Sequence, residues 1–237
     1  MAASEEIQVY MDEMNRPDEF GVEVHHNYVF SGNSIPGYPG AQTPAHVFRL
    51  TPEFSYGLTD QFELGAYLLS SRDSNNNLNI DGEKLRLKYI AQKSPGQGYF
   101  LGANFELGYV ARRLDQNPWA AQLKGIYGLR SGRWIFAVNP NISWIVSGSV
   151  ATPATLELDT KLDYQIERNF ALGLESYNGL GSIDGHTLPS QQGQNLYLVI
   201  DTALDGFELN LGIGRGFSAV SDKWLAKAIV SIPLGIK

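Results

Sequence analysis

Residues 154–167 decide the fold of this chain, because apolar and polar side chains alternate along Ala-Thr-Leu-Glu-Leu-Asp-Thr-Lys-Leu-Asp-Tyr-Gln-Ile-Glu. Such a period of two predicts a β-strand with one apolar and one charged face. Residues 46–58 and 98–112 repeat the pattern. In all, the alternation predicts twelve strands, at 20–30, 46–58, 61–71, 83–92, 98–112, 119–130, 133–146, 154–167, 169–179, 194–204, 206–217 and 223–236.

The connections between these strands alternate in length. Short turns at 57–60, 93–98, 130–133, 167–169 and 204–206 are interleaved with longer links at 31–45, 72–82, 147–153 and 180–193. Outer-membrane barrels have this asymmetry, with short periplasmic turns and long extracellular loops. We therefore expect an all-β fold, a single closed antiparallel transmembrane barrel of about 12 strands over residues 20–237 in the bacterial outer membrane. An even strand number places both termini in the periplasm.

Aromatic residues indicate which face meets lipid. Tyr56 and Phe62 flank one short turn, Tyr164 and Phe170 flank another, and all four lie on the apolar face. Aromatic rings gather at membrane interfaces in this way. A soluble barrel of twelve strands would instead need its apolar face to fill a wide interior, which is difficult. The apolar face is expected to point outward, and the charged face into the lumen.

Composition narrows the functional classes. The chain has 237 residues, no cysteine and a net charge of −7, which argues against nucleic-acid binding and thiolate chemistry. Residues 1–19 contain six acidic residues and one arginine. We expect this segment to be a periplasmic lead-in that lies along the barrel mouth or folds into it. Residues 1–4 resemble an expression start on a mature chain whose export signal was removed.

The predicted lumen carries charge of both signs. The basic pore-lining candidates are Arg49, Arg86, Lys88, Arg112 and Lys124. The acidic candidates are Glu53, Glu106, Asp159, Asp163, Glu175, Asp201 and Glu208. Strand order places a basic arc opposite an acidic arc, which would set up a transverse field that selects solutes by charge. Alternatively, the charges pair with one another, as for Glu106 with Arg86 or Lys124.

Other polar groups give no recognisable catalytic or cofactor site. The chain has four histidines, His25, His26, His46 and His186. A lipase-like barrel would need one of them beside a nucleophilic serine, and no serine has both the matching strand face and an evident oxyanion-hole partner. His26 falls on the nominal lipid face unless a bulge shifts the register. The oxygen-rich loop 73–83 lacks the calcium-binding spacing of an EF-hand. Loop 31–45 either folds inward as a constriction or stays exposed. No enzyme activity, metal or cofactor is expected.

One stretch resembles a known family. Residues 6–10, residues 17–21 and above all Pro-Glu-Phe-Ser-Tyr-Gly-Leu-Thr-Asp-Gln-Phe-Glu-Leu-Gly at 52–65 resemble the putative phenol-degradation MetA-like outer-membrane proteins. The resemblance covers about the first 65 residues and implies a channel or transporter. Its association with aromatic compounds is indirect. The chain departs from such barrels by ending at Lys237 and not at an aromatic residue.

These observations favour a porin-like channel for passive passage of small hydrophilic or amphipathic solutes. The alternatives are a transporter of hydrophobic or aromatic compounds, a closed barrel that acts through its extracellular loops and, last, a membrane lipase. The expected partners are outer-membrane lipid, lipopolysaccharide and small solutes, with the protein as a monomer.

Overall fold

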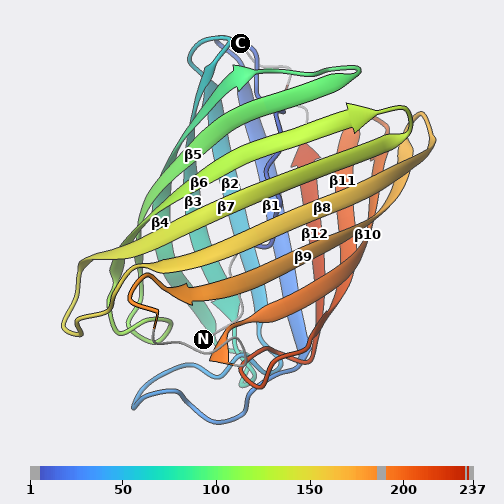
Figure 1. The fold of residues 1–237 in the computed structure, drawn as a ribbon. Helices are drawn as coiled ribbons and strands as arrows, with labels where there is room; N and C mark the ends of the chain where they lie inside the picture. Colours follow the sequence, from blue (N-terminus) through green and yellow to red (C-terminus); the bar gives the residue numbers. More distant parts are fainter. Residues whose placement is uncertain (1–5, 186–190, 233, 235–237) are drawn as a thin grey trace.

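The computed structural model describes residues 6–185, 191–232 and 234, and its strands close into a barrel (Figure 1). Each strand pairs antiparallel with its sequence neighbours, and β1 pairs with β12 to close the ring. The twelve strands are β1 (Phe20–Ser31), β2 (Phe48–Gly57), β3 (Phe62–Arg72), β4 (Leu78–Gln92), β5 (Gly98–Val110), β6 (Trp119–Ser131), β7 (Trp134–Ser147), β8 (Thr155–Glu167), β9 (Phe170–Ser182), β10 (Gln194–Leu204), β11 (Phe207–Gly216) and β12 (Trp224–Ile232). The predicted fold class and strand number are confirmed. Among the described residues, no helix is long and apolar enough to span a membrane.

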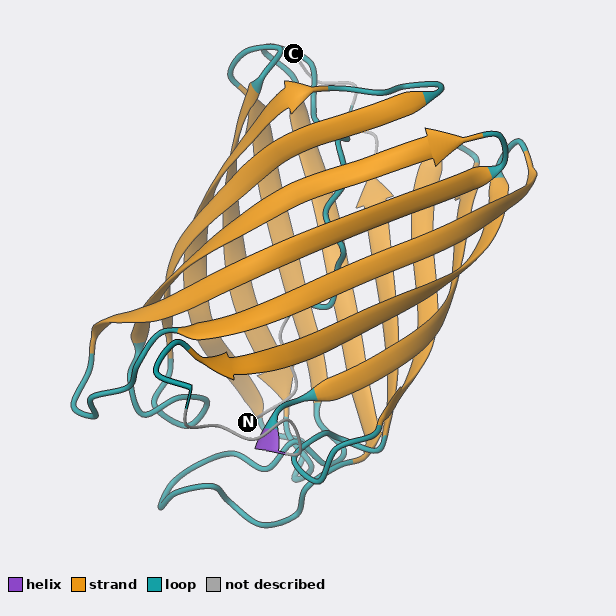
Figure 2. Ribbon diagram, in the orientation of Figure 1, coloured by secondary structure: helices purple, strands orange, loops and turns teal. Residues whose placement is uncertain are grey.

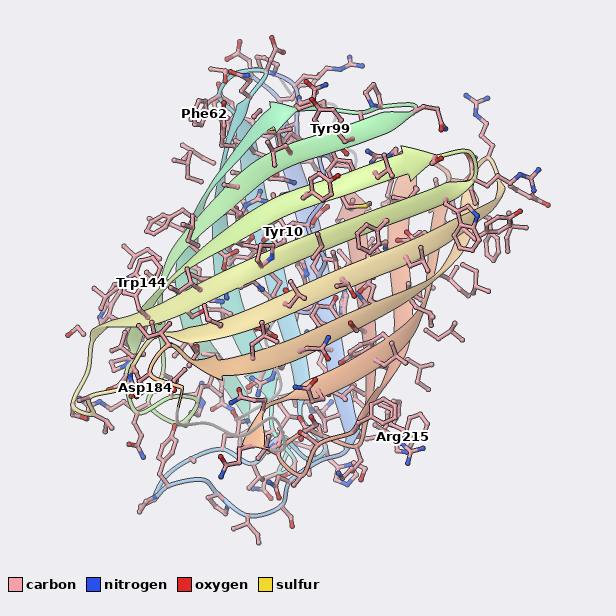
Figure 3. The ribbon with its side chains drawn as sticks, in the orientation of Figure 1. Tyr10, Phe62, Tyr99, Trp144, Asp184 and Arg215 are labelled. Carbon is pink, nitrogen blue, oxygen red and sulfur yellow. The ribbon has the colours of Figure 1, made fainter. Side chains whose placement is uncertain are left out.

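The apolar face points outward, as the alternation predicts. On β8, Leu162 is 42% exposed whereas its neighbours Lys161 and Asp163 are buried. Aromatic pairs surround both ends of this exterior. Rings of Phe62 and Tyr89 lie 4.8 Å apart at the short-turn end, where Figure 3 labels Phe62 and Tyr99. Further pairs are Phe20–Tyr56, Trp134–Tyr164, Phe105–Trp144 and Tyr109–Trp119.

Several predicted strand ends differ from the structure by two residues or more, among them the start of β2, which is Phe48 and not residue 46. β4 begins at Leu78, five residues before the expected start, because Asp81 is an extra residue between the pairs Leu69↔Gly82 and Ser70↔Ile80. A bulge of this kind interrupts alternation, so a period-two pattern cannot be followed across it. β5 ends at Val110 instead of residue 112, and β9 continues to Ser182 instead of residue 179.

A tight turn replaces most of the predicted 72–82 loop. The carboxylate of Asp73 accepts hydrogen bonds from the backbone N–H groups of Asn75 and Asn77 and from the Asn77 side chain. These are local bonds of the kind that Asp forms in turns. The Asp73 oxygens therefore hold the turn itself together.

Residues 7–12 run inside the barrel. Figure 2 shows this segment as a strandless trace within the ring of strands. Ile7, Val9 and Tyr10 are each at most 5% exposed and pack in the central hydrophobic cluster. The segment leaves through the short-turn end, where the backbone N–H of Asp18 donates to the Gly57 carbonyl at 2.9 Å. Of the two placements that the sequence allowed, the mouth or the lumen, residues 7–12 take the lumen.

Candidate functional site: an occupied, charge-paired lumen

Tyr10 holds the N-terminal segment in the middle of the lumen. Its backbone N–H donates to Asn139 Oδ1 at 2.7 Å, and its carbonyl accepts from Asn139 Nδ2 at 3.0 Å. The phenol lies 2.7 Å from the Tyr67 hydroxyl and donates to Glu106 at 3.2 Å. The Lys124 ammonium lies 4.5 Å from the ring centroid, within cation–π range. One residue thus contacts β3, β5, β6 and β7.

Acidic residues of the N-terminal segment pair with basic groups of the barrel wall. Asp12 lies 2.7 Å from Arg130 and accepts a 2.6 Å hydrogen bond from the Ser94 backbone N–H. Glu13 lies 3.0 Å from the other Arg130 nitrogen, and Lys88 donates to the Glu13 carbonyl at 2.6 Å. Burying an acid without a cationic partner would be costly, so the contacts of the buried Asp12 favour its place in the lumen, whereas the Glu13 side chain is exposed.

The predicted basic wall is paired within itself. Arg86 lies 2.6 Å from both Glu53 and Glu63. The β4–β5 register places Arg86 opposite Glu106, yet the guanidinium turns toward β2 and β3. Glu106 instead lies 3.9 Å from Lys84. The pairing expected for Glu106 is therefore wrong in its partner, because side chains that share a face can turn toward either neighbouring strand.

The predicted acidic wall also contains its own cations. Lys161 lies 2.9 Å from Glu175, 2.7 Å from Asp201 and 3.3 Å from Asp163. Lys227 pairs with Glu175 and donates to the Ile7 carbonyl at 3.0 Å. Lys227 was missed among the lumen candidates, although its alternation within residues 224–232 points it inward. Charges on each wall are thus paired locally, which weakens a field across the lumen.

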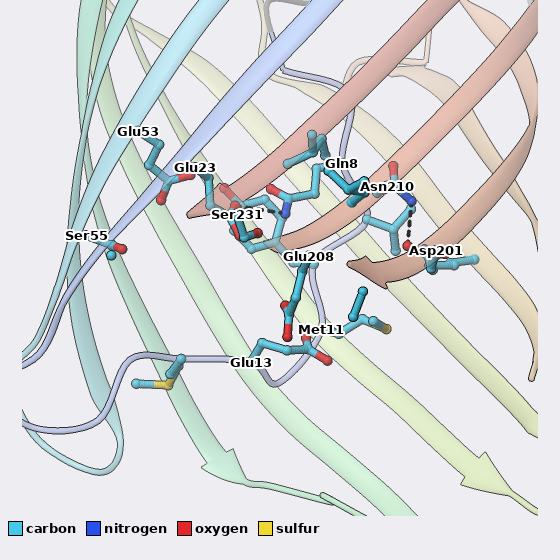
Figure 4. A pocket seen from close by; sticks show the side chains of 18 of the residues that line it. Gln8, Met11, Glu13, Glu23, Glu53, Ser55, Asp201, Glu208, Asn210 and Ser231 are labelled. Atoms are coloured by element: carbon cyan, nitrogen blue, oxygen red, sulfur yellow. Dashed lines mark hydrogen bonds and ion pairs between the residues drawn. The ribbon is translucent and has the colours of Figure 1, made fainter. Parts of the chain in front are cut away.

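The candidate pore-lining residues occupy different positions. Lys88, Lys124 and Asp159 are buried inside the barrel, and Lys124 lies 3.7 Å from Asp159. Arg49 is buried 3.9 Å from Asp81. Figure 4 shows Asp201 and Glu208 on the wall of an inner cavity. Arg112 does not lie on the inner wall, because β5 ends two residues before it and the side chain is exposed in a loop.

An inner cavity of about 720 Å³ lies between the N-terminal segment and the wall (Figure 4). Its lining extends from Asn169 and Gly206 in the short turns to Tyr10. Eight carboxylate residues line it against three basic residues. The carboxylates are Glu13, Glu23, Glu53, Glu63, Asp163, Glu175, Asp201 and Glu208, and the bases are Arg86, Lys88 and Lys161. The ionisable residues of the lining are therefore predominantly acidic, beside apolar residues such as Val9 and Ile229.

The histidines form no hydrolase site among the described residues. Pairing is regular through His25 and His26, so no bulge turns His26 inward, and its ring lies 5.9 Å from that of Phe48 on the outer face. His25 points inward and is 1% exposed. His46 lies in the loop before β2, and His186 lies outside the described residues.

Loop 31–45 lies at the end opposite the short turns (Figure 1). The Tyr38 hydroxyl donates to the Arg112 carbonyl at 2.7 Å, and the Gln42 backbone N–H donates to the Arg113 carbonyl at 2.7 Å. These bonds tie the loop to the β5–β6 connection. Tyr38 is half-buried, and this burial raises the pKa of its phenol.

Solved structures of outer-membrane channels share this fold. The KdgM porin in complex with disordered oligogalacturonate has a TM-score of 0.61 and 8% identity, over 90% of this chain and 99% of that one. An outer-membrane channel from Pseudomonas putida F1 has a TM-score of 0.61 and 16% identity, over 95% of this chain and 99% of that one. The fold is that of outer-membrane channels. The NanC porin has the same fold, with a TM-score of 0.58 and 11% identity over 90% of this chain and 100% of that one.

No family model and no curated protein matches the chain. The resemblance to the MetA-like proteins is therefore not confirmed, whereas the outer-membrane type of barrel is.

Proposed function

We propose that this protein is an outer-membrane channel for passive passage of small hydrophilic or amphipathic solutes. The acid-lined cavity of about 720 Å³ carries the proposal, because it reaches from the short-turn end to Tyr10 in the middle of a closed barrel. An uncharged core would serve a purely structural barrel equally well, whereas a charged, hydrated wall is typical of a conducting lumen. The excess of carboxylates favours cations over anions.

The exterior supports placement in the outer membrane. Its apolar band and aromatic ends suit contact with lipid and lipopolysaccharide. The barrel begins with β1 and ends with β12 at the short-turn end, which we assign to the periplasm. Every described strand pairs on both sides, so no free sheet edge needs a partner, and this supports a monomer.

The N-terminal segment limits the width of the path. Tyr10 is 2% exposed and reaches the wall on several strands, so solutes pass beside the segment or after its displacement. This geometry supports small solutes and a low conductance.

Single-channel recording in planar bilayers tests the proposal. The full chain should give discrete steps that scale with salt, with cation selectivity, and Tyr10→Ala should increase the step size because it removes a ring from the lumen. Tyr99→Ala is the matched control, since Tyr99 is 55% exposed on the outer face. Silent bilayers with both folded variants would refute a conducting role.

A transporter of aromatic compounds, as the MetA-like resemblance would imply, has one supporting observation. Tyr177 and Tyr197 form a buried edge-to-face pair at 5.5 Å inside the barrel. However, continuous pairing among the described strands leaves no lateral opening through which a hydrophobic compound could reach the membrane. A lipase function has no supporting constellation in the described chain.

A further inference from the structure

Three potential metal ligands converge on the lumen wall where β1 meets β2. His25 Nε2 lies 3.4 Å from Glu53 Oε2 and 3.9 Å from Glu23 Oε2, and the three ligand atoms all lie within 4.8 Å of one another. Ligand atoms of a tetrahedral Zn²⁺ site with bonds of about 2.0–2.1 Å are roughly 3.4 Å apart. The distance between Glu53 Oε2 and His25 Nε2 has that value. Glu23 Oε2, at 3.9 Å from His25 Nε2, has to move only slightly to reach it.

The register brings two carboxylates together, and the ion pair with Arg86 compensates the charge of Glu53 alone. Glu23 and Glu53 lie directly opposite each other in the β1–β2 ladder and share the inner face. Like charges in such a pair repel and destabilise a sheet. Figure 4 shows both carboxylates side by side on the cavity wall. A divalent cation between them would turn the repulsion into attraction.

Each carboxylate is already held by an outer partner through its other oxygen. Ser231 donates to Glu23 Oε1 at 2.7 Å, and Arg86 lies 2.6 Å from Glu53 Oε1. The Oε2 atoms face His25, and that of Glu23 also accepts a long hydrogen bond, 3.5 Å, from Gln8 Nε2. Metal-binding carboxylates are commonly oriented by such hydrogen bonds, which tune affinity. Arg86 therefore orients Glu53 without occupying the oxygen that faces the histidine.

Among the described residues, the ion-pair contacts of His25 are those of Nε2 with Glu53 and Glu23. Neither ring nitrogen makes a hydrogen bond there, and the side chain is 1% exposed. An unsatisfied buried imidazole is costly, whereas a neutral imidazole is a preferred ligand of Zn²⁺ and related ions. We propose that Glu23, His25 and Glu53 bind one divalent transition-metal ion of the Zn²⁺ type, with the fourth position open to water.

The inner cavity gives the ion access. Glu23 and Glu53 both line it, and the Glu23 side chain is 32% exposed, so it can adjust as the ion enters. One nitrogen and two oxygen ligands suit Zn²⁺ better than Mg²⁺ or Ca²⁺, which prefer oxygen alone. The site is independent of whether the barrel conducts.

Isothermal titration of untagged, chelator-treated, folded protein with ZnCl₂ tests the proposal. The expected result is one saturable site per chain. His25→Gln should weaken it by more than the roughly 10–100-fold that loss of an outer partner produces, and Ser231→Ala should weaken it within that range. With Co²⁺ in place of Zn²⁺, the absorption spectrum should show a tetrahedral ion in the wild type and lose those bands in His25→Gln.

His26→Gln is the matched control, because it removes the neighbouring histidine from the outer face and should leave affinity unchanged. Glu23→Gln provides a second loss variant at a half-exposed position, so it decides the matter if His25→Gln fails to fold. Absence of a saturable site in the folded wild type would overturn the proposal. Unchanged affinity in the folded Glu23→Gln or His25→Gln protein would also overturn it.

Discussion

Asn139 is expected to hold the N-terminal segment in the lumen. Its side chain makes two hydrogen bonds to the Tyr10 backbone, at 2.7 and 3.0 Å, and it is fully buried on β7. Each such bond contributes about 0.5–1.5 kcal/mol, so Asn139→Ala should cost the docked segment roughly 1–3 kcal/mol. That energy corresponds to about a 5- to 150-fold increase in the displaced population.

Thiol labelling measures this displacement directly, because the chain contains no cysteine. We would introduce Met11→Cys, at a half-buried position of the segment, and follow its reaction with a water-soluble maleimide in folded protein. If opening precedes labelling, the rate should rise by the same factor in the Asn139→Ala background. Asn141→Ala is the control, since Asn141 lies on the same face of β7 but donates to Asp159 at 2.6 Å.

Equal labelling rates in the Asn139→Ala and Asn141→Ala proteins would refute the reasoning. Such a result would mean that packing of Ile7, Val9 and Tyr10, and not the two backbone bonds, determines how often the segment leaves.

Three further outcomes are expected. Lys161→Met leaves neighbouring buried carboxylates without their cation, so urea unfolding in lipid vesicles should show a loss of about 3–5 kcal/mol. Gly214→Ala would drive a Cβ into the Tyr197 ring and should cost about 1–3 kcal/mol, whereas Gly37→Ala meets nothing within 4 Å and should be neutral. Hydrogen bonds from Asn77 lower the pKa of Asp73, so the turn it holds should persist above the ordinary carboxyl range and loosen as pH falls through the depressed folded-state pKa; an NMR titration of Asp73 with an unshifted midpoint would contradict this.

The sequence predicts the fold well because alternation is a local property. The residues of each strand indicate by themselves which face points outward, as on β8, where the exposed Leu162 lies between the buried Lys161 and Asp163. The pattern fails where an extra residue enters a strand. Asp81 is such a residue, and for that reason alternation does not identify the first five residues of β4. Boundaries of this kind depend on pairing with another strand.

The lumen is less predictable because its contacts join distant parts of the chain. Alternation identifies Glu106 and Arg86 as inward-facing, but their partners depend on which neighbouring side chain each can reach. Nothing in residues 1–19 alone shows that Asp12 meets Arg130, since 118 residues separate them. Short range rules therefore identify the face of a residue and leave its partner open.

The width of the barrel explains why the segment and the charges occur together. Twelve strands enclose more space than inward side chains can fill, so the interior needs either water or additional chain. On one part of the wall, Phe100, Ile126 and Val199 point inward and pack in one cluster with the segment. Without residues 7–10 this cluster would face water, whereas the acidic cavity beside it is already polar. The inner wall is thus divided into an apolar part that holds the segment and a charged part that remains available to solutes. Displacement of the segment should be unfavourable because it exposes the apolar part to water.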